Sequence, residues 1–362
     1  MSINPTFFHK KLIHWYLENG RALPWRTTTN PYFIWLSEIM LQQTRVAQGL
    51  PYYNKFIRSF PMIQDLAKAE EDEVLKMWQG LGYYSRARNL HFTAKYISYE
   101  RGGIFPTSYA ELIKLKGVGD YTASAIASIC FDETTAVVDG NVYRVLARFF
   151  GISTPINSSK GIREFKNLAQ ELIDKDQPGT YNQAIMEFGA RYCVPQNPNC
   201  KDCIYNDKCV AFGKNKVVSY PVKLRKSTVK KRYFNYIVVL SEDKMTIVQQ
   251  RTGRGIWQNL FEFPLIETEI DVDDAQLRQL QEFKEMSSAW KIESLVLYNK
   301  EVIVHKLSHQ HLYTRFWIAE AIQLPEDRIE MNKKMIPIAK VNAYAVPVLI
   351  ENFISNFSIF KI

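Results

Sequence analysis

The 362-residue chain is poor in cysteine, with five in all, and no run of apolar residues is long enough to span a membrane. Its start has no basic and apolar leader, so we expect no secretory signal. Disulfide frameworks belong mostly to small secreted domains that are rich in cysteine. The low cysteine content and the expected lack of a secretory signal therefore disfavour a disulfide framework here. With 46% hydrophobic and 23% charged residues, the composition is that of a globular protein, and the length allows two or three domains.

Acidic residues are missing from one long segment, between Asp207 and Glu242. Nine lysines and arginines fall in this segment, and because the formal net charge is +9, the rest of the chain is nearly neutral. A basic segment of this kind is either a solvated tether or a strap that follows the phosphates of a nucleic acid.

Four of the five cysteines form one compact pattern, Cys193-x6-Cys200-x2-Cys203-x5-Cys209. Four thiolates at this spacing suit tetrahedral zinc or a cubane iron–sulfur cluster. Zinc sites usually contain two closely spaced pairs, and here only Cys200 and Cys203 form one. The spacing therefore favours an iron–sulfur cluster and leaves zinc as the alternative.

The residue pattern changes once along the chain, from helical periodicity to β-rich runs. Helical periodicity and turn signals dominate residues 6 to about 210. Residues 233–240 and 245–250 are β-rich runs with a short polar turn between them, which predicts a β-hairpin. Residues 311–319 are a further strand candidate, and residues 343–357 are a candidate closing helix. The predicted fold class is multidomain, an all-α region followed by an α+β domain.

A glycine motif, Gly117-Val118-Gly119, separates two of the predicted helices. Glycines allow a tight turn and a close approach of the backbone to another surface. The N–H groups at the start of the following helix can then hold a phosphate without reading base sequence. The alternative is a plain helix connection. Further along, Asp139 precedes the helix expected at 141–150, where it can act as an N-cap in its ionised form.

The order of hairpin, carboxylate and four-cysteine loop resembles the helix-hairpin-helix DNA glycosylase superfamily, which includes endonuclease III. Within it, three segments resemble the MutY-type adenine DNA glycosylases: PWR at 24–26, WLSEIMLQQTRV at 35–46 and GLGYYSRARNL at 80–90. The resemblance implies excision of adenine mispaired with 8-oxoguanine or guanine, in base excision repair. It also implies a 4Fe-4S cluster held by the four clustered cysteines.

The resemblance further implies a division of the chain. Residues 1–212 are expected to form the helical catalytic region, with the helix-hairpin-helix at about 112–131 and the cluster loop at 193–209. Residues 213–232 are expected to form a basic linker. Residues 233–362 are expected to form a Nudix-like domain that recognises the lesion.

Removal of a base from a duplex requires that the base is flipped out, that the leaving purine is protonated and that the cationic sugar is stabilised. Glu38 lies in the apolar segment 33–41, where desolvation favours the protonated form of a general acid. Its alternative role is a surface charge at the edge of the helix. Asp139 is expected to stay ionised and to stabilise the sugar. The resemblance assigns the same roles to both residues.

Tyr121 stands two residues after Gly119, where bifunctional relatives carry a lysine that attacks the sugar. A tyrosine cannot form an imine, so we expect a monofunctional enzyme that leaves an abasic site, with Tyr121 positioning the sugar. The resemblance implies contacts with the substrate for further residues. They are Arg26 and Gln183 at the adenine, Leu41, Gln43 and Tyr83 in the duplex, and Gly117, Val118 and Gly119 at the DNA backbone.

Leu307-Ser308-His309 stands where the family places a Phe-Ser-His loop that probes 8-oxoguanine. The leucine removes an aromatic contact, whereas Ser308 and His309 keep their hydrogen-bonding groups. An ordinary loop is the alternative. The dense carboxylate helix of a Nudix hydrolase does not follow Gly255, so we expect no hydrolase activity from this domain.

The expected partners are double-stranded DNA with A:8-oxoguanine or A:G mispairs and downstream enzymes that repair abasic sites. We expect a monomer in the bacterial cytoplasm, associated with the nucleoid through DNA. Two alternatives stay open: an endonuclease III-like pyrimidine glycosylase and lyase, and a non-catalytic DNA-binding iron–sulfur protein. Excision assays on defined mispairs distinguish them.

Overall fold

The computed structural model describes residues 4–224, 229–325 and 331–360, in two compact units. The first unit comprises residues 1–68 and 89–226, and the second comprises residues 69–88 and 227–362. Arg225 and Lys226 of the expected basic linker lie outside the described residues. Within the described part of the chain, no helix is both long and apolar enough to cross a membrane.

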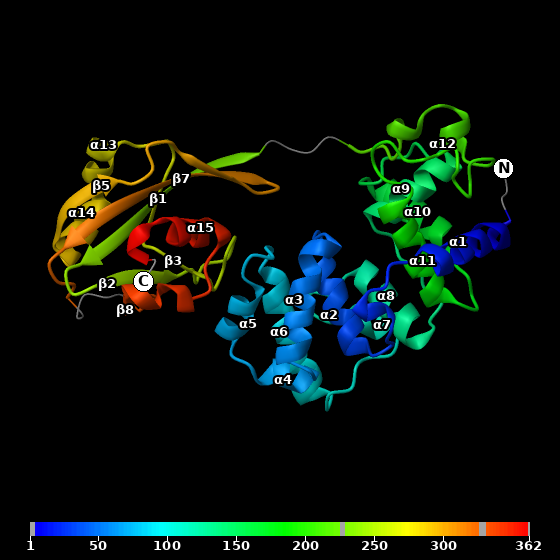
Figure 1. Cartoon of the computed structure of the whole chain (residues 1–362), viewed down its shortest axis with the longest axis horizontal. Helices are drawn as coiled ribbons and strands as arrows, with labels where there is room; N and C mark the ends of the chain where they lie inside the picture. Colours follow the sequence, from blue (N-terminus) through cyan, green and yellow to red (C-terminus); the bar gives the residue numbers. More distant parts are fainter. Residues whose placement is uncertain (1–3, 225–228, 326–330, 361–362) are drawn as a thin grey trace. The chain divides into compact units, whose positions relative to one another are not determined.

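The first unit is built from helices, as predicted (Figure 1). They are α1 (Pro5–Asn19), η1 (Pro24–Arg26), α2 (Pro31–Leu41), α3 (Val46–Ser59), α4 (Ile63–Lys68), α6 (Ser85–Lys95), η2 (Tyr96–Glu100), α7 (Tyr109–Leu112), α8 (Asp120–Phe131), α9 (Gly140–Phe150), α10 (Ser159–Leu172), α11 (Pro178–Arg191), α12 (Val210–Gly213) and η3 (Val217–Ser219). The first four residues of α6 belong to the second unit by their contacts.

A buried aromatic cluster joins the two ends of this helical unit. The ring of Tyr205 stacks on Phe8 of α1 with 4.9 Å between centroids, and Phe149 of α9 lies 5.0 Å from both rings. The Tyr205 hydroxyl also donates to the Phe8 carbonyl at 2.6 Å. Tyr205 therefore anchors the four-cysteine segment to α1 and α9.

The second unit contains all the strands that the structure describes, together with four helices. The strands are β1 (Lys230–Ser241), β2 (Met245–Gln250), β3 (Phe261–Glu262), β4 (Leu265–Thr268), β5 (Ile292–Leu297), β6 (Ile303–Lys306), β7 (Gln310–Ala321) and β8 (Lys333–Pro337). The described helices are α5 (Glu71–Trp78), α13 (Asp274–Gln279), α14 (Gln281–Trp290) and α15 (Val348–Asn356), with short 3-10 helices at η5 (Ile338–Ala343) and η6 (Ser358–Phe360).

Two sheets form the frame of this unit. The larger has the order β4-β1-β7-β5, with β6 also paired to β7, and the smaller has the order β3-β2-β8. Alternate residues of β1 point to two separate cores, because successive side chains of a strand face opposite sides. Phe234, Tyr236 and Val238 join the core covered by α15, whereas Ile237 and Val239 join the core covered by α13 and α14. The α+β prediction is confirmed.

The hairpin predicted from residues 233–250 is wrong in its pairing. Both strands form, but β1 pairs with β4 and β7, whereas β2 pairs with β3 and β8. The turn is tight, with Ser241 Oγ accepting from Met245 N at 3.1 Å, but the chain passes through it from one sheet to the other. Two boundaries also differ from the prediction. The strand β1 already begins at Lys230, and α15 begins only at Val348, after Pro347 as its N-cap.

Candidate active site

Glu38 is carried by α2, a helix that is buried on most of its surface. Asn30 caps the helix by accepting from Tyr32 N at 3.0 Å, and Pro31 occupies the first turn, where its missing N–H costs nothing. Eight residues of the helix are buried, and Glu38 is only 8% exposed. The pKa of Glu38 is raised to about 7, chiefly by burial and also by the nearby Asp139, against the opposing effects of Tyr121 and Arg26. Glu38 is therefore available in both protonation states near neutral pH, as a general acid requires.

Asp139 is the N-cap of α9, as predicted. Its Oδ1 accepts from the backbone N–H groups of Asn141 and Val142 at 2.9 and 2.8 Å, and its Oδ2 accepts from Asn141 Nδ2 at 2.7 Å. We expected the cap to keep this carboxyl ionised. Burial raises the pKa of Asp139 above its ordinary value, while the hydrogen bonds and Arg144 favour the ionised form, so the ionised state stays a prediction.

Tyr121, in the first turn of α8, lies between the two carboxyl groups. Its hydroxyl is 2.9 Å from Met186 Sδ and also within hydrogen-bonding reach of Glu38. A hydroxyl has one proton to donate, and a carboxylate accepts it far better than a thioether does. Burial and the two nearby carboxyl groups raise the pKa of Tyr121 well above its ordinary value, so it stays a neutral donor.

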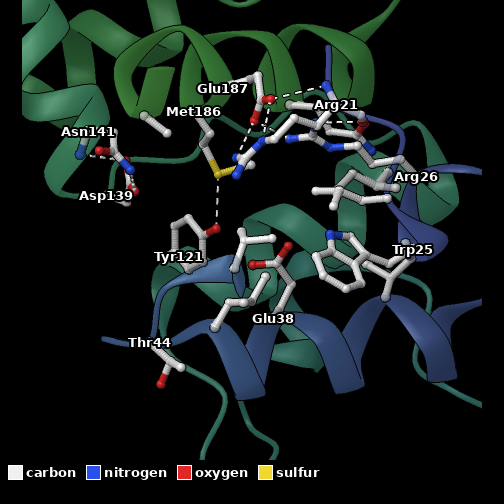
Figure 2. A pocket seen from close by; sticks show the side chains of 17 residues that line it. Arg21, Trp25, Arg26, Glu38, Thr44, Tyr121, Asp139, Asn141, Met186 and Glu187 are labelled. Atoms are coloured by element: carbon white, nitrogen blue, oxygen red, sulfur yellow. Dashed lines mark hydrogen bonds and ion pairs between the residues drawn. The ribbon is translucent and has the colours of Figure 1, made fainter. Parts of the chain in front are cut away.

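These three side chains share one cavity with a volume of about 170 Å³, as Figure 2 shows. Three further predicted site residues, Arg26, Leu41 and Gln183, also line the cavity, and Gly119 precedes the helix that brings Tyr121 to it. The three expected catalytic residues and the two expected adenine contacts, Arg26 and Gln183, therefore converge on one cavity. They come from α2, α8, α11, η1 and the N-cap of α9.

A buried ion cluster closes the wall opposite the carboxyl groups. Glu187 of α11 is fully buried, and it accepts from Arg21 at 2.6 and 2.7 Å and from Arg26 at 2.7 Å. Burial alone would raise the pKa of Glu187, but the bonds from the two arginines outweigh it and lower the pKa to about 2. The guanidinium of Arg26 also lies over the ring of Tyr16, 5.4 Å from its centroid.

The sequence reasoning missed Glu187, Arg21, Asn141, Trp25 and Met186, which line the same cavity. One local signal was present for α11, because Gln183, Met186 and Glu187 are spaced by three and four residues and so share a helix face. For the two arginines there was no such signal, since their partner is more than 160 residues away.

A chain of hydrogen bonds runs from Asp139 to the cysteine segment. Arg144 Nη2 donates to Asn141 Oδ1 at 2.9 Å and to the Gly189 carbonyl at 2.6 Å, and its Nε donates to the Cys193 carbonyl at 2.7 Å. The side chain of Asn141 thus holds Asp139 on one side and is held by Arg144 on the other.

The glycine motif forms the predicted hairpin between α7 and α8. Gly117 has a φ of +82°, and a Cβ there would approach the Cβ of Asn89 to 2.7 Å, so this position needs glycine. Gly119 is the N-cap of α8, and a Cβ there would meet nothing within 4 Å, so its backbone is open to an approaching surface. Val118, also expected at the DNA backbone, has a structural part in the turn. Its side chain is buried and its N–H donates to the Leu115 carbonyl at 3.1 Å, so it supports the turn by packing.

The remaining predicted contact residues do not line the cavity. Gln43 and Tyr83 are exposed and have positive φ values of 57° and 48°, which is uncommon for residues other than glycine. Ser308 and His309 lie in the exposed turn from β6 to β7, with Ser308 Oγ 3.3 Å from His309 Nδ1. Leu307 packs partly buried against the core of the second unit.

The four predicted metal ligands are half-buried free thiols in one segment of the first unit. Every pair among Cys193, Cys200, Cys203 and Cys209 is close enough to interact electrostatically. Burial raises the pKa of the Cys203 thiol to about 12, so a bound cation would be needed to hold it as a thiolate. Among the described residues, no group of three or more His, Cys, Asp or Glu side chains is arranged to hold a metal ion.

Arg148 supports this segment from α9. Its guanidinium lies 3.4 Å from Cys193 Sγ and donates to the carbonyls of Val194 and Pro195 at 2.7 and 2.8 Å. Backbone N–H groups reach the sulfurs of Cys203 and Cys209. Positive charge and N–H donors around several thiols are the environment that stabilises a negatively charged thiolate centre.

Comparisons with known proteins agree with this arrangement. A family model described as HhH-GPD superfamily base excision DNA repair protein matches residues 36–174, and a NUDIX domain model matches residues 235–356. An adenine DNA glycosylase of Buchnera aphidicola subsp. Baizongia pistaciae is 37% identical over 86% of this chain and 86% of its own. That of Mus musculus is 45% identical over 57% of this chain and 42% of its own.

Solved structures match the helical part. A thermostable thymine-DNA glycosylase is similar with a TM-score of 0.54 and 29% identity, over 58% of this chain and 97% of that one. A non-covalent endonuclease III–DNA complex has a TM-score of 0.51 at 21% identity, over 59% of this chain and 99% of that one, which shows the shared fold.

Proposed function

The chain belongs to the adenine DNA glycosylases of the HhH-GPD superfamily, and we propose that it hydrolyses the N-glycosidic bond of adenine mispaired with 8-oxoguanine or guanine. The observation that carries this proposal is the pair of unlike carboxyl groups, Glu38 and Asp139, in one cavity with Tyr121. Excision of a base that has been flipped from the duplex needs an acid and a stabiliser of positive charge, and these residues supply both.

The proposed reaction begins with a proton from Glu38. The proton passes to a ring nitrogen of adenine, the bond between the sugar and the base breaks, and its electron pair leaves with the base. The anionic form of Asp139 then stabilises the cationic sugar, and Tyr121 holds the Glu38 carboxylate by a hydrogen bond. A water molecule adds to the sugar and returns its proton to Glu38. The products are free adenine and an abasic site.

A Schiff-base step is absent from this proposal, because Tyr121 stands where a bifunctional enzyme carries its lysine. The enzyme is therefore proposed to be monofunctional and to leave strand cleavage to downstream enzymes that repair abasic sites. The hairpin of Gly117, Val118 and Gly119 is proposed to hold the DNA backbone. Leu41, Gln43 and Tyr83 are proposed to enter the duplex, and Ser308 and His309 to read the base opposite adenine.

We also propose that Cys193, Cys200, Cys203 and Cys209 hold a 4Fe-4S cluster. The mutual proximity of the four thiols supports it, as does the Arg148 guanidinium 3.4 Å from Cys193 Sγ, and the spacing of the four cysteines favours such a cluster over zinc. When bound, the cluster would supply a structural cross-link rather than a reacting group. The proposed site of action is the chromosomal DNA of a bacterial cell, for which a monomer suffices.

The test uses duplexes that carry adenine opposite 8-oxoguanine, guanine or thymine. The proposal expects release of adenine from the first two duplexes, and strand breaks only after treatment with alkali. Strand breaks before alkali would indicate a lyase, and DNA binding without base release would indicate a non-catalytic protein.

A further inference from the structure

A second and larger cavity adjoins the catalytic one. Its volume is about 750 Å³, against about 170 Å³ for the catalytic cavity, and its lining includes Tyr16, Asp132, Asp176 and Thr180. We call it the rear chamber. Arg26, Ile129 and Gln183 line both cavities and so form the wall between them.

The two polar residues of this wall are held unequally. Arg26 is fixed by Glu187 at 2.7 Å, by the Arg21 carbonyl at 3.1 Å and by its position over the Tyr16 ring. Gln183 is held, in the part of the chain that the structure describes, by one side-chain hydrogen bond, which Tyr16 OH donates to its Oε1 at 2.6 Å. Rotation of Gln183 therefore breaks one bond, whereas displacement of Arg26 breaks a buried ion pair.

The lining of the rear chamber fits a small neutral molecule. It presents the carboxyl groups of Asp132 and Asp176 and several threonine hydroxyls, and its one cation among the described lining residues, Arg26, is already paired with Glu187. Such a surface repels phosphate groups, so it is poorly suited to the DNA backbone. It is well suited to a free purine base, whose amino group and ring N–H donate hydrogen bonds to carboxylates and hydroxyls.

Among the residues expected to enter the duplex, Leu41, Gln43 and Tyr83 do not line the rear chamber. Figure 2 shows Thr44, the neighbour of Gln43, and Arg26, which lines both cavities, on opposite sides of Glu38. Resting on the proposed function, we propose that cleaved adenine passes Gln183 into the rear chamber and leaves through it while the abasic strand is still bound. Tyr16 and Gln183 form the gate, whose opening breaks their hydrogen bond, and no covalent bond is made or broken.

The test follows labelled adenine in a complex of the full-length enzyme with DNA. A duplex with radiolabelled adenine opposite 8-oxoguanine is cleaved under single-turnover conditions, and rapid gel filtration separates free adenine from the enzyme–product complex. For the wild type we expect adenine to leave before the abasic DNA dissociates. Thr180→Trp fills the chamber, so adenine release should slow by about tenfold or more while the rate of bond cleavage stays the same. Thr107→Trp, on an exposed residue that lines neither cavity, is the matched control.

Tyr16→Phe tests the gate with a minimal change and also serves if Thr180→Trp fails to fold. Loss of the bond to Gln183 should accelerate adenine release. The proposal is overturned if adenine and abasic DNA leave the wild type together, or if Tyr16→Phe leaves release unchanged, or if a folded Thr180→Trp releases adenine at the wild-type rate. An enzyme that frees no labelled adenine at all would instead contradict the proposed function.

Discussion

Arg26 donates a hydrogen bond from Nη2 to Oε2 of Glu187 at 2.7 Å, and this buried ion pair fixes the wall of the catalytic cavity. Glu187→Gln should therefore lower both stability and excision, because it leaves two arginines without their common anion. Breaking a buried pair costs about 3–5 kcal/mol. Denaturant unfolding and single-turnover excision measure the two effects, and Glu18→Gln, an exposed glutamate of α1, is the control.

The same pair predicts a pH dependence. The pKa of Glu187 is lowered from 4.5 to about 2 by folding, so its contribution to stability is present above about 4.5 and is lost as the pH falls towards 2. The difference in the free energy of unfolding between the wild type and Glu187→Gln should therefore shrink between pH 5 and about pH 2. A difference that grows on acidification would show that the ion pair does not stabilise the fold.

Glu38→Gln should leave DNA binding intact and reduce single-turnover excision by roughly 10²- to 10⁴-fold, the usual contribution of a general acid. Because the pKa of Glu38 is raised to about 7, wild-type excision should fall as the pH rises through 7, where the carboxyl group loses its proton. Above pH 7, Glu38→Gln should also stabilise the fold, since it removes the cost of a buried carboxylate. Excision that rises through pH 7 would assign the acid role to another group.

Asp139 allows capping and catalysis to be separated. Asn is as good an N-cap as Asp, so Asp139→Asn should change the free energy of unfolding by only a few tenths of a kcal/mol. It should nevertheless cripple excision, because an amide cannot balance the charge of the sugar. Asp139→Ala loses the cap as well and should cost about 0.5–2 kcal/mol of stability. Retained activity in Asp139→Asn would reduce Asp139 to a capping residue.

Local motifs and long-range packing explain what the sequence could predict here. Three site residues each stand in a short sequence pattern that also determines the local backbone. Glu38 lies in an apolar helix, Tyr121 follows the glycine hairpin, and Asp139 is a helix N-cap. Glu187 joins the site only because α11 packs beside α1 and η1, and no pattern near Arg21 or Arg26 announces that contact. The β1–β2 error has the same origin, since alternation identifies a strand but not its partner, and the parallel partner of β1 lies about 80 residues away.

The cysteine cluster predicts a brown protein with iron and sulfide near four each per chain, as the resemblance implies. Cys203→Ser should lose iron and lower the midpoint of thermal unfolding, because the segment anchored by Tyr205 depends on the ligands. Cys130→Ser, which changes the cysteine outside the cluster, should keep the full iron content. Elemental analysis with one zinc and no sulfide would contradict the assignment.

Recognition of 8-oxoguanine is expected to be separable from the excision of adenine. Ser308 and His309 are exposed in the turn from β6 to β7, while the catalytic cavity is formed by the first unit alone. Ser308→Ala with His309→Ala should therefore leave slow adenine excision intact but reduce the preference for 8-oxoguanine over guanine. A hydrogen-bonded base contact is worth roughly 1–3 kcal/mol, so the preference should fall by about ten- to a hundredfold.

The measurement is the ratio of single-turnover rates and affinities on the two duplexes at fixed salt, because electrostatic binding to any duplex would otherwise hide the change. Lys300→Ala with Glu301→Ala, exposed in the connection before β6, is the control pair and keeps the net charge. Leu307→Phe should hold or raise the preference if the larger ring leaves the core contacts of Leu307 and reaches the DNA. An unchanged ratio in the Ser308 and His309 double variant would assign recognition of the lesion to Gln43, Leu41 and Tyr83. The backbone of Gln43 and of Tyr83 is held at a positive φ, which is uncommon for residues other than glycine.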